Sequence, residues 1–457
     1  MSIRGRSGQP KVLVFATRFN PLAARISIAL ACAGFHVAAL APPGHPVREV
    51  RKIRGHFVFR AGSRSIIRAI DQWSPDLLVC TDDPAVSELQ NLYERTASSN
   101  DKATKRIADL IELSLGPPTS FPAMRNKSDF LALAEREGVR CPKTIVFPAD
   151  RAFEPARANL NYPIVVKADH SDGGRCVRIV PERADLRAAV WELQTPCTWQ
   201  ARRFFGVMLG SEYLGWLTLP LRRTISLQEH IVGRSANRAV VCWRGKVLAG
   251  ISVEAVEVIH DRGPASVVRV IDHPEMTLVC KRMVERLELS GFVGFDFILD
   301  SANRVWLLEL NPRVIQTCHF ILADGTNFAA SLYAQMKRLP ALSQSVPTHR
   351  DLVALFPNEM LRSPSSKYLQ SCQHDVPWDE PELVRCVLNR ELRINIRRQV
   401  RIFLEHYFPS IVDVLVRIGL VAAHAGYSPS HFEDAPPAFV TPSREFAQNS
   451  DSHAGSL

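Results

Sequence analysis

Residues 291–313 read GFVGFDFILDSANRVWLLELNPR, and this stretch decides the fold of the chain. Two apolar runs, residues 292–299 and 305–310, flank a short turn rich in good turn formers, which predicts a β-hairpin. Side chains two apart on a strand point to the same face. The hairpin therefore brings Asp296 of its first strand and Glu309 and Asn311 of its second strand to one surface, with Arg313 just beyond.

The polar residues of this hairpin form a candidate metal site. Carboxylate and amide oxygens are hard ligands of the kind that Mg²⁺ takes alongside phosphate oxygens and water. Asp296 and Glu309 stand among Phe, Ile, Leu and Trp, where an unpaired carboxylate is costly. The alternative is an edge hairpin whose polar residues face solvent. We predict that Asp296, Glu309 and Asn311 bind a metal ion.

Length and composition indicate an ordinary globular protein. The chain has 457 residues, of which 46% are hydrophobic and 22% charged, enough for about three domains of ~150 residues. Its formal net charge of +10 suits anionic ligands such as nucleotides. The basic residues are spread along the chain with no long block, so we expect no nucleic-acid partner.

Cysteine usage and the absence of long apolar runs predict the cellular location. The ten cysteines include no CxxC pair and no Cys/His ligand spacing, which argues against a zinc site. The first ten residues have no apolar core of a signal peptide. No run approaches the ~20 uncharged apolar residues that span a bilayer. We expect a cytoplasmic protein with free thiols and no integral membrane segment.

The N-terminal region alternates between strand and helix patterns. Residues 11–17, 35–40, 57–60 and 76–81 read as strands separated by helical segments, which predicts a parallel α/β unit. The turn after the first strand has no glycine, so a dinucleotide site of the GxGxxG kind is not expected. Asp82 and Asp83 end the last of these strands, and we interpret them as a cap of the next helix.

A glycine-containing loop follows the strand at residues 162–169, which ends near Lys167. The loop holds Ser171, Gly173 and Gly174. Paired glycines allow backbone amides to approach phosphate oxygens closely, and a lysine adds positive charge where negative charge concentrates. The same letters also predict a simple hairpin turn, and the two interpretations are compatible.

These motifs, in this order, resemble the ATP-grasp superfamily, in its carbamoyl-phosphate synthetase and biotin carboxylase-like branch. The resemblance is most specific at Asp296 and at residues 309–313 (ELNPR), and it covers roughly residues 11–340. Residues 126–144 resemble the opening of the family domain, with Asn126 where Asp is common. Residues 225–233 resemble its hinge strand. The stretch 200–224 departs from the family pattern.

The resemblance implies a mixed α/β and α+β architecture: an ATP-grasp fold with an N-terminal Rossmann-like pre-ATP-grasp domain and a helical C-terminal extension. We expect the first domain at residues 1–120 and the ATP-grasp domain at 121–345, divided into 121–225 and 226–345. A mostly helical extension follows at 346–426, and a Ser/Pro-rich tail predicted to be disordered at 427–457. The extension suits packing on the core better than membrane contact, and a homodimer interface is the other alternative.

The resemblance also implies a ligand for each motif. Lys127 and Lys167 meet the phosphates of ATP, and the loop of Ser171, Gly173 and Gly174 covers them. Glu229 holds the adenine or ribose beside the backbone of His230 and Ile231. Two Mg²⁺ or Mn²⁺ ions bind at Asp296, Glu309 and Asn311.

The implied reaction is that of an ADP-forming, C–N bond-forming ligase. A small-molecule carboxylate attacks the γ-phosphate to give an acylphosphate, and an amine or similar nucleophile displaces the phosphate. Arg313 suits the carboxylate or the acylphosphate oxygens, and Arg238 is a further candidate for an anionic group. We expect His319 to be packed or hydrogen-bonded, since nothing adjacent in the sequence forms a triad with it. No general base is evident.

Two alternatives remain. The same fold also suits a small-molecule kinase or carboxylase, and a protein that binds ATP for regulation or as a scaffold belongs to a different class. Intact metal-binding residues favour an enzyme. Because a fold does not fix a substrate, the identity of the carboxylate and of the nucleophile is left open.

Overall fold

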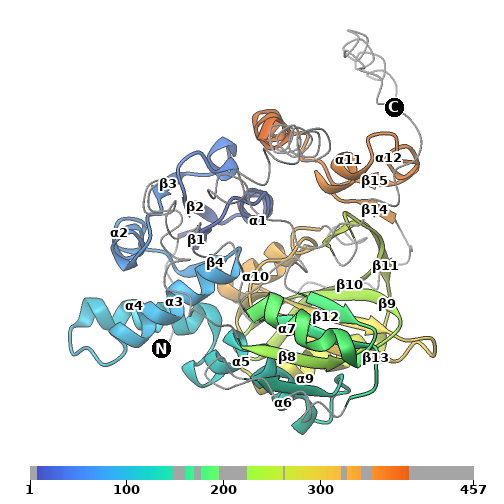
Figure 1. Ribbon diagram of the computed structural model, residues 1–457. Helices are drawn as coiled ribbons and strands as arrows, with labels where there is room; N and C mark the ends of the chain where they lie inside the picture. Colours follow the sequence, from blue (N-terminus) through green and yellow to red (C-terminus); the bar gives the residue numbers. More distant parts are fainter. Residues whose placement is uncertain are drawn as a thin grey trace, which may run out of the picture.

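The structure is a computed structural model, and it describes residues 8–147, 160–168, 177–194, 224–260, 263–320, 327–340 and 352–390. Its strands form three sheets with helices packed on them, which makes a mixed α/β fold (Figure 1). Two hydrophobic cores each run from the N-terminal sheet to the largest sheet, so these two parts share their interiors. The smallest sheet has a core of its own.

The N-terminal sheet is parallel, with strand order β3-β2-β1-β4. Its elements are β1 (Lys11–Phe15), α1 (Leu22–Cys32), β2 (His36–Ala41), η1 (Pro46–Glu49), β3 (Gly55–Val58), α2 (Ser63–Trp73), β4 (Leu77–Cys80), α3 (Asp83–Thr96) and α4 (Lys102–Leu115). Strands β1, β2 and β4 are almost wholly buried, as expected where helices cover both faces of a parallel sheet. The predicted parallel α/β unit is confirmed, while its assignment as a Rossmann-like pre-ATP-grasp domain stays a prediction.

Asp82 joins the ends of two strands of this sheet. Its carboxylate accepts from Ala85 N–H at 2.9 Å, which caps α3, and from the N–H groups of Thr17 and Arg18 at 2.8 and 3.1 Å, in the loop after β1. Burial raises the pKa of Asp82, and these donors act against that shift. The cap predicted for this position is therefore confirmed for Asp82, which also fixes the loop after β1.

The segment after α4 is helical although it contains Pro117, Pro118 and Pro122, residues that in such a cluster also predict a loop. It forms η2 (Pro118–Ser120) and α5 (Phe121–Arg125), which run into α6 (Lys127–Arg136). Pro118 and Pro122 lie in the first turns of their helices, where a missing N–H costs no hydrogen bond. Prolines at these positions start helices and do not interrupt them.

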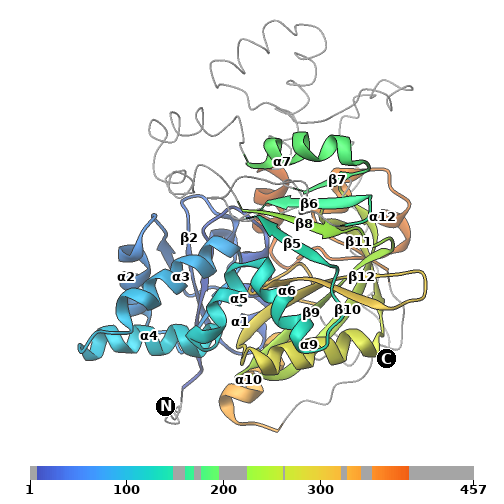
Figure 2. The ribbon, with the colours of Figure 1, turned by 60° about the horizontal axis from the view of Figure 1, so that its bottom comes forward.

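The smallest sheet is antiparallel and has the order β5-β8-β6-β7. It comprises β5 (Thr144–Phe147), β6 (Ile164–Ala168), β7 (Val177–Val180), η4 (Arg183–Asp185), α7 (Leu186–Gln194) and β8 (Ile225–Glu229). Figure 2 shows α7 lying over this sheet, above the rest of the molecule. The loop of residues 169–176 and the stretch 195–223 lie outside the described residues.

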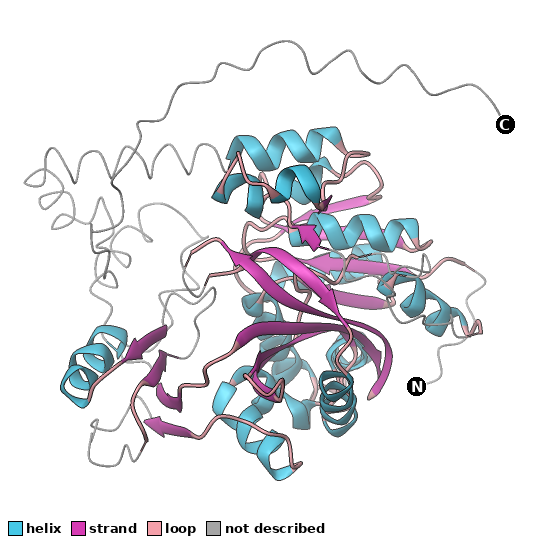
Figure 3. Cartoon of the chain, turned by 90° about the vertical axis from the view of Figure 1, so that its right-hand side faces the viewer, coloured by secondary structure: helices cyan, strands magenta, loops and turns pink. Residues whose placement is uncertain are grey.

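The largest sheet has seven strands in the order β13-β12-β9-β10-β11-β14-β15 (Figure 3). It comprises β9 (Arg234–Trp243), β10 (Lys246–Val258), β11 (Ala265–Ile271), β12 (Gly291–Leu299), β13 (Val305–Asn311), β14 (Leu352–Ala354) and β15 (Gln373–His374). Helix α9 (Pro274–Arg286) packs on one face with the core that contains Phe295. Helix α10 (Phe328–Lys337) packs on the other face, where it also meets α1. The predicted β12–β13 hairpin is confirmed, and β9 and β10 form a second hairpin.

The described part of the C-terminal extension completes the edge of this sheet. Besides β14 and β15 it contains α11 (Asn358–Arg362), α12 (Tyr368–Ser371) and a helical segment at residues 381–390. Leu383 and Val387 of that segment pack into the core shared with β1 and α10. Residues 391–457, with the predicted amphipathic helices and tail, lie outside the described residues. Within the described part of the chain, no helix has the length and apolar character to cross a membrane.

Candidate active site

A cavity of about 1570 Å³ lies where the three sheets and the C-terminal extension meet. All the predicted site residues that the structure describes, except Arg238, line it: Lys127, Lys167, Glu229, His230, Ile231, Asp296, Glu309, Asn311 and Arg313. Ser171, Gly173 and Gly174 lie outside the described residues. The fold thus gathers into one cavity residues that are spread over 187 sequence positions, from Lys127 to Arg313.

The β12–β13 hairpin delivers the acidic residues. Asp296 is paired directly with Glu309, and Gly294 with Asn311. Beyond the Asp296–Glu309 pair, toward the turn of the hairpin, the register shifts by one residue at Leu308, which is a β-bulge. On the other side of β12, Asn237 of β9 is the direct partner of Asp296. Cross-strand partners share a face, so two carboxylates and two amides converge on the cavity.

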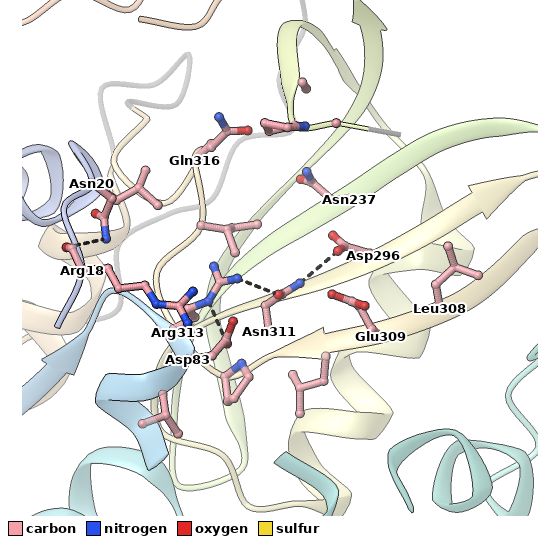
Figure 4. Close-up of a pocket in the computed structure, with 18 of the residues that line it drawn as sticks. Arg18, Asn20, Asp83, Asn237, Asp296, Leu308, Glu309, Asn311, Arg313 and Gln316 are labelled. Atoms are coloured by element: carbon pink, nitrogen blue, oxygen red, sulfur yellow. Dashed lines mark hydrogen bonds and ion pairs between the residues drawn. The ribbon is translucent and has the colours of Figure 1, made fainter. Parts of the chain in front are cut away.

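Asn311 and Arg313 form a hydrogen-bonded chain from Asp296 to the N-terminal domain (Figure 4). Asn311 Nδ2 donates to Asp296 Oδ2 at 3.0 Å, and its Oδ1 accepts from Arg313 Nη2 at 3.1 Å. Arg313 Nε donates to Asp83 Oδ1 at 2.8 Å. Burial acts to lower the pKa of Arg313, but Asp83 outweighs it and the net shift is upward. Arg313 is a charged group held at the cavity wall.

Asp83 lines the cavity and pairs with Arg313, a placement that the sequence interpretation missed. The two neighbouring acids divide the work, because Asp82 caps α3 while Asp83, one residue later, faces Arg313. The only signal in the sequence was the pair of acids at a strand end, and it did not separate the two roles. The contact forms because Val314 N–H donates to Cys80 O at 3.0 Å, which fastens the segment after β13 to the end of β4.

Two lysines face the hairpin carboxylates. Lys127 Nζ lies 2.6 Å from Glu309 Oε2. Burial acts to lower the pKa of Lys127, but Glu309 outweighs it and raises the pKa. The pKa of Lys167 falls to about 8, first because it is buried and also because Lys127 is near. Both lysines are thus partly buried in a region of mixed charge.

The pKa values of the two carboxylates shift in opposite directions. Burial raises the pKa of Asp296 to about 7, and the charge of Glu309 adds to the shift. Burial also acts to raise the pKa of Glu309, but Lys127 and then Lys167 outweigh it, so the net shift is downward. Adjacent acids that cannot both ionise without further positive charge are the donors that a divalent cation satisfies.

The donor set therefore fits a divalent cation bound by oxygen ligands. Asn237 Oδ1, opposite Asp296, is buried and has no hydrogen-bond partner among the described residues. Asn311 turns its amide nitrogen toward Asp296 and its oxygen toward Arg313. No group of three or more His, Cys, Asp or Glu side chains in the described ranges is placed to hold a metal. Any site here depends on two carboxylates together with amide oxygens.

The predicted hinge residues lie at the end of β8. Glu229 N–H donates to Lys143 O at 2.9 Å, and Glu229 Oε2 accepts from Lys143 N–H at 3.3 Å. His230 Nδ1 is buried without a hydrogen-bond partner in the described part of the chain. This segment joins the small sheet to the large one and lines the cavity between them.

Arg238 is not part of the cavity, so its prediction as a ligand of an anionic group is wrong. It follows Asn237 on β9 and therefore points to the opposite face, where it is the partner of Phe295. Arg238 Nη1 donates to Ser252 Oγ at 2.7 Å, and burial lowers the pKa of Arg238. The alternation of side chains along a strand gives it a structural place under α9.

His319 is buried and hydrogen-bonded, as the sequence predicts, but its partner is far away in sequence. Its Nε2 lies 3.0 and 2.9 Å from the two oxygens of Asp375, and Arg25 forms an ion pair with the same carboxylate. All three residues line the cavity. We call them the Arg25–Asp375–His319 cluster. Nothing in the sequence pointed to it.

Comparisons with known proteins identify solved structures with a similar fold, all of low sequence identity. No protein-family model and no curated protein sequence matches the chain. Among solved structures, carboxyaminoimidazole ribonucleotide synthase from Aspergillus clavatus, complexed with ATP, matches with a TM-score of 0.53 and 15% identity over 75% of this chain and 80% of that one.

Two biotin carboxylase structures also match. The biotin carboxylase domain of the 2-oxoglutarate carboxylase of Hydrogenobacter thermophilus has a TM-score of 0.51 and 14% identity, covering 75% of this chain and 73% of that one. Biotin carboxylase from Campylobacter jejuni has a TM-score of 0.50 and 15% identity, with 74% and 72% covered. The chain has the ATP-grasp fold of these proteins, so the resemblance seen in the sequence is confirmed at the level of the fold.

Proposed function

We propose that the protein is an ATP- and Mg²⁺-dependent ligase that activates a small-molecule carboxylate as an acylphosphate and transfers it to an amine, releasing ADP and phosphate. The observation that carries the proposal is the shared cavity. Two lysines, two facing carboxylates, an amide and a held arginine line it together with the hinge strand. Phosphoryl transfer needs positioning and charge stabilisation with little covalent chemistry from the protein.

The lysines and the hinge form the proposed nucleotide side. Lys127 and Lys167 bind the phosphates, and Glu229, with the backbone of His230 and Ile231, binds the adenosine. When bound, ATP supplies the phosphoryl group, and Mg²⁺ or Mn²⁺ at Asp296, Glu309 and Asn311 neutralises its charge. The low pKa of Lys167, caused first by burial, means that a bound polyphosphate stabilises its charged form.

Arg313 forms the proposed carboxylate side. Its guanidinium is fixed by Asp83 through Nε and by Asn311 through Nη2. A guanidinium fork suits a carboxylate or an acylphosphate, because it presents parallel N–H donors to two oxygens. Fixing it in advance removes part of the cost of ordering it when the substrate binds.

The test is nucleotide turnover by the full chain with ATP, Mg²⁺ and panels of carboxylates and amines. We expect ADP and phosphate only in the presence of a specific pair. Glu309→Gln removes a charge from the carboxylate pair and leaves Lys127 without its ion-pair partner. We expect it to reduce turnover by about 10³-fold, the scale of losing a principal electrostatic contact in a reacting site.

Glu382→Gln is the control. Glu382 pairs with Arg385 at the surface, where the two side chains are 54% and 64% exposed, and does not line the cavity. Turnover of this variant is expected to stay within about threefold of the wild type, since a pair at the surface contributes little. Formation of AMP and pyrophosphate would contradict the acylphosphate route. Tight ATP binding without turnover in any panel would favour a regulatory ATP-binding protein.

A further inference from the structure

The Arg25–Asp375–His319 cluster joins three distant parts of the chain in the wall of the cavity. Arg25 comes from α1, His319 from the segment after β13, and Asp375 from the residue after β15. Their side chains are 12%, 6% and 9% exposed, so the cluster is almost completely shielded from water. Charged and titratable groups at this depth are costly unless they are paired. Asp375 pairs with both of its neighbours.

The contact with Asp375 fixes which nitrogen of His319 carries the proton. An ionised carboxylate only accepts hydrogen bonds, and both of its oxygens lie within 3.0 Å of Nε2. Nε2–H therefore donates, and the neutral ring keeps a free lone pair on Nδ1. Burial lowers the pKa of His319, Arg25 adds to this, and Asp375 opposes it. The lowered pKa favours the neutral form of the ring, in which Nδ1 carries no proton.

Two atoms of the cluster have unsatisfied hydrogen-bonding capacity. His319 Nδ1, an acceptor, and Arg25 Nε, a donor, are both buried without a partner among the described residues. A buried polar atom left unpaired costs about 1–3 kcal/mol. An acceptor and a donor on side chains that share one carboxylate fit a ligand that offers the opposite pair, a donor and an acceptor.

A second buried histidine, His273, shows that an unpaired ring nitrogen is not by itself evidence of a binding site. His273 also has a buried Nδ1 without a partner in the described ranges. Its Nε2, however, faces the backbone oxygen of Asn303 and not a carboxylate, and His273 does not line the cavity. His319 differs in both respects, which makes His273 a matched control.

The segment that carries Arg313 also carries His319. Residues 312–320 follow β13 and cross the open position at Gly294, where an added Cβ would lie 2.6 Å from the Ile315 side chain. Position 294 must therefore be glycine for Ile315 to pack this closely against β12. One short segment, fastened to β4, thus places a group for the acyl substrate and a group for its attacker in the same cavity.

We propose that His319 is the general base of amine transfer, that Asp375 positions its ring, and that Arg25 Nε binds an anionic group on the incoming amine. The inference rests on the ligase function proposed above. The unprotonated amine nitrogen bonds to the carbonyl carbon of the acylphosphate. The bond between the carbonyl carbon and the bridging oxygen breaks, and its electron pair leaves with the phosphate. The proton lost by the nitrogen passes to His319 Nδ1, and Asp375 stabilises the resulting imidazolium.

The substrate class follows from the two unpaired atoms. The amine donates its hydrogen to Nδ1, and a carboxylate or similar group on the same molecule accepts from Arg25 Nε. Glycine is the smallest probe of this kind. Methylamine lacks the anionic group and is the matched comparison.

The experiment separates acyl activation from amine transfer. The wild type is assayed with ATP, Mg²⁺ and a carboxylate panel, with either hydroxylamine or glycine as acceptor. Hydroxylamine is largely unprotonated near neutral pH and needs little help from a base. We expect His319→Gln to lower amide formation with glycine by about 10²–10⁴-fold, the usual contribution of a general base, and to lower hydroxamate formation at least about tenfold less. His273→Gln should affect both equally.

Several outcomes would overturn the inference. Amide formation unchanged in His319→Gln, or amide and hydroxamate formation reduced in parallel, would leave the cluster a structural clamp only. Methylamine used as well as glycine would remove the role of Arg25. Hydroxamate formed by the wild type without any glycine product would overturn the inference and leave the ligase function standing. If the wild type forms no ADP and no hydroxamate with any carboxylate, the ligase function itself is overturned.

A second measurement reads the protonation of His319 in the wild type directly. Nitrogen NMR of the ¹⁵N-histidine-labelled protein reports the tautomer of each ring. We expect His319, identified by its loss in His319→Gln spectra, to carry its proton on Nε2 and none on Nδ1. A proton on Nδ1 of the neutral ring would contradict the proposal.

Discussion

Two polar clusters line the cavity, and they differ in how far apart their members lie in the sequence. Asp296, Glu309 and Asn311 come from one hairpin, within 16 residues of chain. In the Arg25–Asp375–His319 cluster, Arg25 and Asp375 are 350 residues apart. Strand periodicity predicts the first cluster, because it requires only one hairpin in register. The second forms only when the N-terminal sheet, the hairpin segment and the C-terminal extension meet.

The clusters also differ in how their charges are balanced. In the hairpin, Asp296 has its pKa raised to about 7 by burial and by Glu309, so the pair lacks positive charge despite the two lysines. In the second cluster, Arg25 and Asp375 neutralise one another, and what remains unsatisfied is two hydrogen-bonding atoms. The first cluster suits a cation and its phosphate ligands, while the second suits a neutral amine with an anionic group.

The largest expected effect on stability comes from a substitution in the Arg25–Asp375–His319 cluster. Asp375→Asn leaves Arg25 charged and without its buried partner, so we expect a loss of about 3–5 kcal/mol in the free energy of unfolding. Urea unfolding of the full chain measures it. Asp379→Asn is the control, because Asp379 pairs with Lys52 at the surface, where its side chain is 56% exposed, and should cost at most about 1 kcal/mol. Equal losses in the two variants would mean that burial of the cluster contributes nothing.

The next effect is a pH dependence of stability that we expect from His45, a buried histidine that is hydrogen-bonded on both ring nitrogens. His45 Nδ1 accepts from Val47 N–H, and Nε2 faces Arg18 O. Burial lowers the pKa of His45 to about 4. In the unfolded chain the pKa is about 6.5, so the stability due to neutral His45 is complete above pH 6.5 and is lost as the pH falls toward 4. The loss amounts to about 3 kcal/mol.

Unfolding measured between pH 7.5 and pH 4 tests this expectation. The free energy of unfolding should fall more steeply in the wild type than in His45→Gln, and the difference should accumulate below about pH 6.5. Parallel pH profiles for the two proteins would show that His45 titrates normally in the folded state. They would also weaken the argument from burial that keeps His319 neutral.

The smallest effect tests the link between the hairpin and the N-terminal domain. Asp83→Asn weakens the hold on Arg313 without removing the guanidinium. We expect kcat/KM for the carboxylate to fall about tenfold, the equivalent of about 1.4 kcal/mol for one charge-assisted hydrogen bond. Glu94→Gln, on the exposed side of the same helix α3, is the control. No change in Asp83→Asn would show that Arg313 is positioned without Asp83.

Much of the fold was predictable, because its signals are local. The β9–β10 turn uses Arg244 and Gly245 at positive φ, and the β12–β13 strands are apolar runs with few polar residues. The helical segment at residues 118–125 was not recognised, since prolines in a first helical turn resemble those of a loop. The assignment of Arg238 was wrong because neighbouring residues on a strand point to opposite faces, and the face of Asn237 was fixed only by pairing with Asp296.

The candidate site was likewise predictable only where its signals are local in the sequence. The residues from Lys127 to Arg313 were found through motifs, each of which is short and continuous. Asp83 and Asp375 were missed because their roles are defined only by contact with Arg313 and His319, which lie 230 and 56 residues away. No spacing rule relates such pairs, and only the packing of the sheets brings them together.

Transfer of oxygen from the carboxylate to phosphate tests the central claim most directly. A carboxylate identified in the turnover assay is labelled with ¹⁸O and incubated with ATP, Mg²⁺ and its amine. Attack of the carboxylate on the γ-phosphate, followed by displacement, leaves one labelled oxygen in each phosphate released, and the account predicts this result. Unlabelled phosphate with ADP, or labelled AMP with pyrophosphate, would contradict an acylphosphate formed in this cavity.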